Sequence, residues 1–137
     1  MQLNFSIPGD DMDMAGIASS TLKKKLQQIG VDNAIIKRTV VALYEAEINM
    51  VIHGGGGDIT INVNPEEIQC ELTDHGPGIA DVNLAMQEGY STATDAIREM
   101  GFGAGMGLPN IQRNSDAMEI HTVPGEGTTV KIIIKIR

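Results

Sequence analysis

The stretch VVALYEAEINMVIHGGGG, residues 40–57, decides how the rest of this chain is understood. Residues 40–52 are apolar nearly all round, a pattern that predicts a buried helix. In a helix running from about Asn33 to His53, Glu45 and Asn49 are four residues apart and therefore share one face. Four consecutive glycines follow His53, and glycine is the usual residue at which a helix ends. We therefore expect a central helix that is covered by the rest of the fold and that ends at its glycine run.

Segments that alternate apolar and polar residues lie on both sides of this helix and predict half-buried strands. A further helix, capped by Asp11 or Asp13, is expected to run to about Ile29. After the second hairpin strand we expect a short helix at 81–88, a polar loop, and a helix begun by the glycines of GMGLPNIQRNSD. The predicted strands are 2–7, 58–63, 68–73, 118–123 and 128–136, the last four forming two hairpins.

The alternation of these strands decides the fold class. A strand that is apolar on one side only belongs to a sheet with one face against helices and the other against water. The sequence therefore predicts an α+β fold: a two-layer α/β sandwich in which a mostly antiparallel sheet of about five strands carries helices on one face. We expect residues 1–137 to form a single domain, because no repeat, low-complexity tract or linker interrupts them.

Composition narrows the possible functions. The net charge is −8 with only 10 lysines and arginines, so neither nucleic acid nor an anionic membrane is an expected partner. Cys70 is the single cysteine, which excludes an internal disulfide and suits a reducing cytoplasm. The first residues lack the basic start and apolar run of a secretion signal, and no later run approaches membrane-spanning length. Glycine is enriched, with 16 of 137 residues, and is clustered as in loops that something approaches closely.

Glu45 and Asn49 are the first candidate site. A carboxylate and an amide on an apolar stripe cost free energy unless something pairs with them. Mg²⁺ takes oxygen ligands such as that of Asn49, and a carboxylate one turn away can act as a general base. The alternative is that Glu45 reaches water at the helix edge and Asn49 caps a neighbouring loop. The helix taken alone favours this alternative.

Three glycine-containing motifs follow. In TDHGPGIA, Asp74 would end a strand and could accept the amino group of adenine, although a plain turn has the same composition. GFGAGMGL, residues 101–108, places glycine at every second position before a helix and suits an anion cradle; one or two such glycines would fit a hinge, but four are hard to dismiss. GEGTT is a hairpin turn whose threonines could offer a hydroxyl to a phosphate.

Taken in order, EAEIN…HG, DHGPGI, GFGAGMGL and GEGTT resemble the four ATP-binding boxes of the GHKL ATPases. That superfamily covers gyrase, heat-shock chaperones, histidine kinases and mismatch-repair proteins. Within it, the short chain and the NMVIHG ending are similar to the bacterial anti-sigma-factor serine kinases of sporulation and stress switches. EGYST…GFGAGMGLPNI is also similar to the switch kinases of stress-sensing complexes. The resemblance spans nearly the whole chain.

The resemblance implies a role for each matching residue. Asn49 would ligate Mg²⁺ between the phosphates, Glu45 would be the catalytic base or orienting carboxylate, and His53 would end the helix beside the nucleotide. Asp74 would bind the adenine amino group, and either Thr128 or Thr129 would contact a phosphate. A mobile lid would cover roughly residues 89–102. The glycine run after His53 is longer than the family pattern needs. The remaining expected nucleotide-binding residues are Gly76, Gly78 and Ile79 around the base and Gly103, Ala104, Gly105, Met106, Gly107 and Leu108 around the phosphates.

The leading hypothesis is therefore an ATP- and Mg²⁺-dependent protein serine/threonine kinase that phosphorylates a small antagonist protein in a partner switch. The alternative is a nucleotide-loaded anti-sigma interaction module that holds its partner with little turnover. The catalytic domain of a histidine kinase is disfavoured, because no helical hairpin with a phosphorylatable histidine precedes the domain. The expected partners are ATP or ADP, an antagonist protein and a sigma factor, and the family also includes homodimers.

Overall fold

Five antiparallel strands form one sheet in the computed structural model, which describes residues 1–9, 12–76 and 107–136. The strand order is β1-β2-β3-β5-β4, so the two hairpins of the sequence lie side by side and β3 pairs with β5 in the middle. The predicted mostly antiparallel sheet of about five strands is confirmed. The strands are β1 (Gln2–Pro8), β2 (Gly56–Val63), β3 (Glu67–Asp74), β4 (Ala117–Val123) and β5 (Gly127–Lys135).

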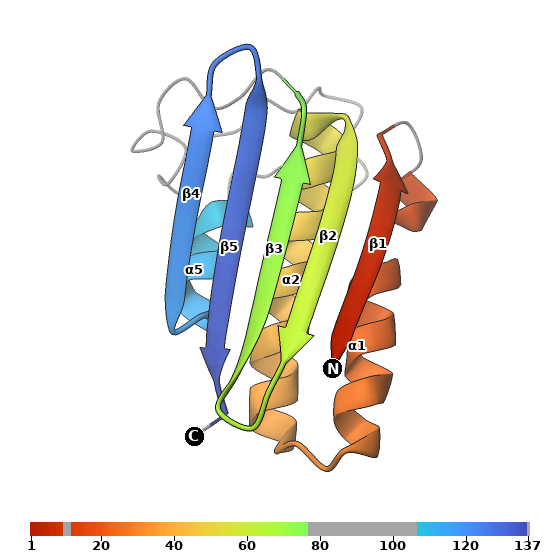
Figure 1. Ribbon diagram of the computed structural model, residues 1–137, viewed down its shortest axis with the longest axis vertical. Coiled ribbons are helices and arrows are strands. Elements are labelled where there is room, and N and C mark those ends of the chain that lie inside the picture. The colour runs from red at the N-terminus through yellow and green to blue at the C-terminus, as the bar shows by residue number, and fades with distance from the viewer. Residues whose placement is uncertain (10–11, 77–106, 137) are drawn as a thin grey trace.

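All the described helices cover the same face of the sheet (Figure 1). The central one, α2, packs against both neighbouring helices and against β2, β3 and β5, as expected of a helix that is apolar nearly all round. The two-layer α/β sandwich is therefore confirmed. The helices are the short 3-10 helix η1 (Met12–Met14), α1 (Ile17–Gln28), α2 (Asn33–Gly54) and α5 (Gly107–Asn114).

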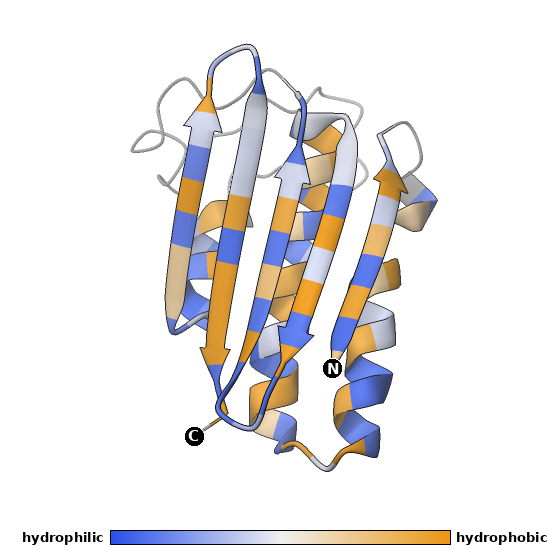
Figure 2. Cartoon of the chain, viewed as in Figure 1, coloured by the Kyte–Doolittle hydropathy of each residue, from blue (hydrophilic) through white to orange (hydrophobic). Residues whose placement is uncertain are grey.

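The core lies between the helices and the inner face of the sheet. Along the strands, polar and apolar residues alternate, and Figure 2 shows this banding most clearly on β1 and β2. Ile59 and Ile61 of β2 and Ile132 and Ile134 of β5 point inward and are at most 1% exposed. The opposite face carries polar side chains such as Glu71, so it faces water as the alternation predicted.

The start of α1 differs from the prediction. Asp13 belongs to η1 and does not cap α1, and the N-cap position is held by Gly16 without a side-chain cap. Asp11, the other predicted cap, lies outside the described residues. The free N–H groups of the first turn are satisfied by Glu47 of α2. Its carboxylate accepts from Gly16 N at 2.7 Å and Ala18 N at 3.2 Å through Oε2, and from Ser19 N at 2.9 Å through Oε1. A residue 28 or more positions away in sequence therefore replaces the local cap.

The other element boundaries follow the prediction closely. Helix α2 begins at Asn33, with Asp32 as a side-chain N-cap, and ends one residue beyond His53. Helix α5 begins within the predicted glycine-started segment. The expected helix at 81–88 and the expected lid at 89–102 lie outside the described residues. No helix in the described ranges combines the length and the apolar character that crossing a membrane would need.

Candidate functional site

Asp74 lies at the end of the sheet, where the C-terminus of α2 meets β3 and β5. It is the last residue of β3, as predicted. Its Oδ1 accepts hydrogen bonds from two backbone N–H groups, those of Gly76 at 3.0 Å and Thr128 at 3.2 Å. The carboxylate is therefore oriented by the backbone of the adjoining loop and of β5, and a ligand that binds it meets an acceptor already in place.

The glycine run after His53 is explained by what surrounds it. Gly54 lies against Asp74, and a Cβ added to it would overlap the Asp74 carboxyl group. Gly55 ends the helix with φ +70°, in the left-handed region that favours glycine. Gly56 and Gly57 belong to β2, where added Cβ atoms would overlap the backbone of β1 and β3 respectively. At every position of the run except Gly55, neighbouring atoms leave no room for a side chain. The run therefore lets the end of α2 pack against the end of β3.

Gly76 completes this contact. A Cβ at Gly76 would lie 2.7 Å from the Cα of Gly54, so the loop after β3 and the end of α2 pack backbone to backbone. The predicted base-pocket residues Asp74 and Gly76 are therefore brought together. Gly78 and Ile79, the other two residues expected around the base, lie outside the described residues.

Glu45, Asn49 and His53 follow one another along α2 at intervals of one turn toward this point, and all three are half-buried. Burial raises the pKa of Glu45, and a hydrogen bond from the side chain of Asn110 on α5 opposes that rise. Burial lowers the pKa of His53, and the negative charge of Asp74 opposes that change. The predicted face therefore exists, with a carboxylate that is harder to ionise than an exposed one and a histidine that is harder to protonate.

Of the two candidate threonines, Thr128 lies on the same side of the sheet as Asp74. Its side chain points inward, is 7% exposed, and shares a hydrogen bond of 3.0 Å with the hydroxyl of Thr122. Thr129 points to the outer face, where its hydroxyl lies 3.2 Å from that of Thr73. Since the described helices lie on the inner face, a ligand held between α2 and the sheet end would lie on the side of Thr128.

The donor set around Asn49 fits one kind of metal. Among the residues that the structure describes, no group of three or more histidine, cysteine, aspartate or glutamate side chains could hold an ion. An ion at the half-buried amide of Asn49 would therefore take most of its ligands from water and from a bound phosphate. Mg²⁺ binds in this way, because it keeps several waters and pairs with phosphate oxygens.

The predicted phosphate loop is described only at its end. Gly107 begins α5, and Leu108 is buried in the core, where it anchors the start of the helix. The other residues expected around the phosphates, Gly103, Ala104, Gly105 and Met106, lie outside the described residues.

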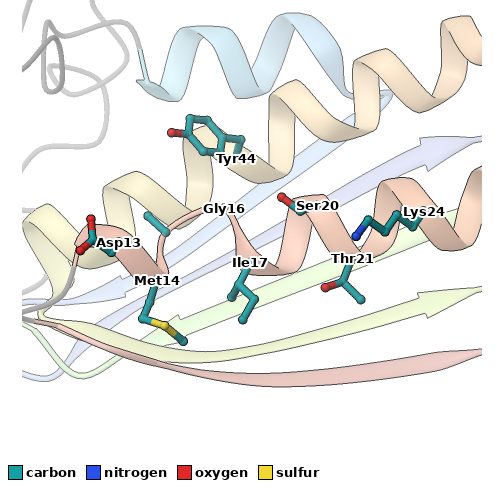
Figure 3. A pocket seen from close by; sticks show the side chains of 9 residues that line it. Asp13, Met14, Gly16, Ile17, Ser20, Thr21, Lys24 and Tyr44 are labelled. Carbon is teal, nitrogen blue, oxygen red and sulfur yellow. The ribbon is translucent and has the colours of Figure 1, made fainter.

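A separate hollow of about 470 Å³ lies between α1 and α2 (Figure 3). Tyr44 lines it from α2, and Gly16 and Lys24 line it from the side of α1, with Gly16 close to the Tyr44 ring. None of the residues predicted for the site lines this hollow, so it is distinct from the site built around Asp74.

Two contributors to this region were missed from the sequence. Asn110 was read only as part of a helix, although a polar residue one turn after a glycine-rich loop is a signal that could have been followed. Glu47 caps α1 from a position 28 residues or more away, which no local pattern in the sequence indicates. A charged residue inside an otherwise apolar helix is the signal that it needs a partner.

Known proteins resemble this chain over most of its length. The anti-sigma F factor of Thermoanaerobacter sp. (strain X514) is 32% identical over 137 residues, covering 96% of this chain and 90% of that protein. The serine/threonine-protein kinase RsbT of Bacillus subtilis is 29% identical over 115 residues, covering 81% and 80%.

Among solved structures, the RsbU and RsbW domains of a Mycobacterium tuberculosis protein match with a TM-score of 0.66 at 17% identity, covering 98% of this chain and 32% of that one. The SiaB–SiaC complex of Pseudomonas aeruginosa matches with a TM-score of 0.61 at 16% identity, covering 96% and 89%. At such identities these two likenesses concern the fold alone. Residues 8–134 match the model described as the histidine kinase-like ATPase domain, and the chain belongs to that family.

Proposed function

We propose that this protein is an ATP-dependent protein serine/threonine kinase that works as a regulatory switch by phosphorylating a small antagonist protein. The observation that carries the proposal is Glu45: a half-buried carboxylate, one turn before Asn49, on the helix whose end lies against Asp74. A pocket that only binds a nucleotide has no need of this carboxylate, whose burial is costly. The similarity to the kinase RsbT supports the reaction class.

In this proposal each residue does one task. Asp74 accepts the amino group of adenine, and its fixed orientation selects a base that donates there. Glu45 accepts or orients the proton of the acceptor hydroxyl while that oxygen bonds to the γ-phosphorus and the bond to the bridging oxygen breaks, releasing ADP. Thr128 faces the phosphates from the inner side of β5. Asn49 would hold Mg²⁺, which would neutralise charge on the phosphates when bound.

Glu45 is suited to this task by its surroundings. Its raised pKa makes the carboxylate a better proton acceptor than an exposed one. The activity should therefore rise with pH as Glu45 loses its proton, above the ordinary pKa of a glutamate.

A second candidate function is favoured by one finding. The 32% identity to an anti-sigma F factor extends over 96% of this chain, which supports a module that holds a sigma factor while loaded with nucleotide. We propose a cytoplasmic location for either function, because Cys70 is a free thiol buried in the core and both partners would be intracellular. The family match over residues 8–134 supports one ATP-binding domain, and a homodimer is part of the proposal by likeness to the family.

Transfer of the γ-phosphate tests the two functions against each other. The full chain is incubated with Mg²⁺, γ-labelled ATP and purified candidate antagonist proteins, and label on a serine or threonine is measured. We expect Glu45→Gln to lose transfer by about 100-fold or more while ATP binding, measured by calorimetry, persists. The matched control is Glu119→Gln on the outer face of β4, which should leave both unchanged.

The opposite outcomes are equally clear. Transfer that survives Glu45→Gln would remove the catalytic role of Glu45. Tight, nucleotide-dependent binding of a sigma factor with no label on any acceptor would favour the interaction module.

A further inference from the structure

We propose that Thr122 is a positioning residue of the nucleotide site: from β4 it holds the hydroxyl of Thr128 so that this hydroxyl donates to an acceptor atom of the bound nucleotide. The inference rests on the proposed function for the identity of the ligand, but the contact between the two threonines can be tested without any ligand. Thr122 and Thr128 lie directly opposite each other on β4 and β5, which run side by side in Figure 1. Their hydroxyl oxygens are 3.0 Å apart.

The inner face of β3, β5 and β4 becomes polar at the end where the candidate site lies. Asp74, Thr128 and Thr122 stand there in one row across the three strands. Further along, the inward residues are apolar, such as Ile120 on β4 and Ile132 on β5. The backbone N–H of Thr128 donates to Oδ1 of Asp74 at 3.2 Å, so Thr128 is held by Asp74 on one side and by Thr122 on the other. Thr122 therefore belongs to the polar end of the sheet that would face a ligand.

A second pair of threonines on the outer face provides a comparison. The hydroxyl oxygens of Thr73 and Thr129 are 3.2 Å apart. Cross-strand threonine pairs of this kind stabilise a sheet without any ligand. The inner pair differs because Thr128 is 7% exposed and lies beside Asp74. The outer pair is thus a matched control, with the same chemistry at the same end of the sheet but on the opposite face.

The hydroxyl protons of the inner pair have two arrangements. Thr122 donates to the carbonyl oxygen of Gly127 at 3.3 Å, and a threonine hydroxyl has only one proton to give. While this bond is made, Thr128 is the donor within the pair. When Thr128 turns its proton to a nucleotide atom, Thr122 can turn its own proton from Gly127 to Thr128. Thr128 then accepts one hydrogen bond while it donates another, and each bond polarises and strengthens the other.

The contact also fixes the rotamer of Thr128 before a ligand arrives. A threonine side chain has three staggered χ1 rotamers, and only one of them places the Thr128 hydroxyl against Thr122. A side chain that is already held in its binding rotamer loses less entropy when the ligand binds. The ligand atom must offer a lone pair, which an oxygen of a phosphate and an unprotonated ring nitrogen of a base both do.

The first test uses the full chain without a ligand. Three-bond NMR couplings from the Thr128 methyl carbon to its backbone nitrogen and carbonyl carbon report the χ1 rotamer. We expect one rotamer in wild type and averaged couplings in Thr122→Val, which keeps the shape of threonine but lacks the hydroxyl. Thr122→Ser, which restores a hydroxyl, and the control Thr73→Val should both keep the wild-type couplings. Unchanged couplings in Thr122→Val would overturn the proposal.

The second test measures the affinity for Mg·ATP by calorimetry. Thr122→Val should weaken binding by about 5-fold, and Thr122→Ser should stay within about 2-fold of wild type, as expected for the loss and the retention of one hydrogen bond. In a Thr128→Val background the loss caused by Thr122→Val should vanish, because a residue that acts through Thr128 has nothing left to position. Thr73→Val should bind as wild type does. Losses from Thr122→Val and Thr128→Val that simply add would also overturn the proposal.

Adenosine, titrated in parallel, identifies the acceptor atom. A weakening of ATP alone in Thr122→Val places the acceptor on a phosphate, an equal weakening of adenosine places it on the base, and either result sustains the role of Thr122. Failure of the proposed kinase function would appear differently. Phosphoryl transfer would then be absent from wild type, while the couplings of Thr128 would still report whether Thr122 holds it.

Discussion

Glu45 and Glu47 are two residues apart on the same buried helix, yet the fold uses them in opposite ways. Glu47 is 0% exposed, and its two oxygens are occupied by backbone N–H groups of α1. Glu45 is half-buried on the face that leads to Asp74, with the Asn110 side chain as its hydrogen-bond donor. Burial raises the pKa of both carboxyl groups, and hydrogen bonds oppose the rise in both.

The difference lies in the partners. A carboxylate filled by backbone donors is part of the framework, because those donors cannot leave without unwinding a helix. A carboxylate held by a single neighbouring side chain keeps acceptor capacity for a ligand or a proton. Burial or a raised pKa alone therefore does not identify a functional acid. The hydrogen-bond partners of its oxygens distinguish a functional carboxylate from a structural one.

The largest expected effect is on the framework side of this comparison. Glu47→Ala removes the acceptor of three N–H groups at the buried start of α1, so we expect the free energy of unfolding to fall by about 3–5 kcal/mol. Glu47→Gln should cost about 1.5–3 kcal/mol, because the amide NH₂ must face at least one of those donors. Urea unfolding measures both.

The control for Glu47 is Glu71→Ala, on the exposed face of β3, which should change stability by no more than about 0.5 kcal/mol. If Glu47→Ala proved as harmless as this control, the cap of α1 would have no energetic importance and the contrast between the two glutamates would collapse.

The next effect concerns the end of α2. Gly54→Ala places a methyl group where the Asp74 carboxyl lies, so we expect a loss of about 1–3 kcal/mol in stability and a weakened affinity for ATP. Gly55→Ala meets open space and is strained only by φ +70°, which should cost about 1 kcal/mol and leave ATP binding intact. Thermal unfolding and calorimetry distinguish the two; equal ATP affinity in both variants would mean that Gly54 does not shape the site.

These examples show which parts of the molecule the sequence could predict. The sheet, the central helix and the position of Asp74 followed from patterns repeated over many residues, and periodicity averages over local exceptions. The prediction that an aspartate near the helix start caps α1 was wrong. The N–H groups there bond to a side chain from α2 instead. A helix that is capped by a residue from another helix shows no fixed sequence spacing between the cap and the helix start.

The candidate site was predicted to a similar extent. Asp74 and Glu45 were identified as candidates from their motifs. The motif alone could not show that Thr128 and Thr129 lie on opposite faces of the sheet, which follows from strand register. Asn110 was predicted only as part of a helix, because its place beside α2 depends on how α5 packs against α2. The glycine run likewise gained its meaning only from the strands and the carboxyl group beside it.

Substitution of Glu45 should change the free energy of unfolding less than substitution of Glu47, and in the opposite direction. Glu45→Gln replaces a carboxylate that burial disfavours with a neutral amide, so stability at pH 7 should rise, by no more than about 1 kcal/mol. Since the folded-state pKa is raised, wild type loses stability as pH rises through it, and the variant should lack that loss. Urea unfolding at pH 4.5 and pH 7 measures it; a large loss of stability in Glu45→Gln would make Glu45 a framework residue like Glu47.

Asp116, at the end of the sheet opposite to Asp74, supplies the smallest effect and calibrates the others. Its pKa is lowered by a hydrogen bond from Lys135 N at 2.7 Å and by Arg38, whose Nη2 lies 3.3 Å from Oδ1. A lowered folded-state pKa contributes stability above the unfolded value near 3.8 that is lost as the pH falls through the folded one. Because the pair is about one-third exposed, Asp116→Asn should cost less than about 1 kcal/mol at pH 6 and nothing measurable at pH 2. Glu126→Gln, in the exposed β4–β5 turn, is the control. A cost that persists unchanged at pH 2 would show that hydrogen-bond geometry, and not the charge of the carboxylate, is what Asp116 contributes.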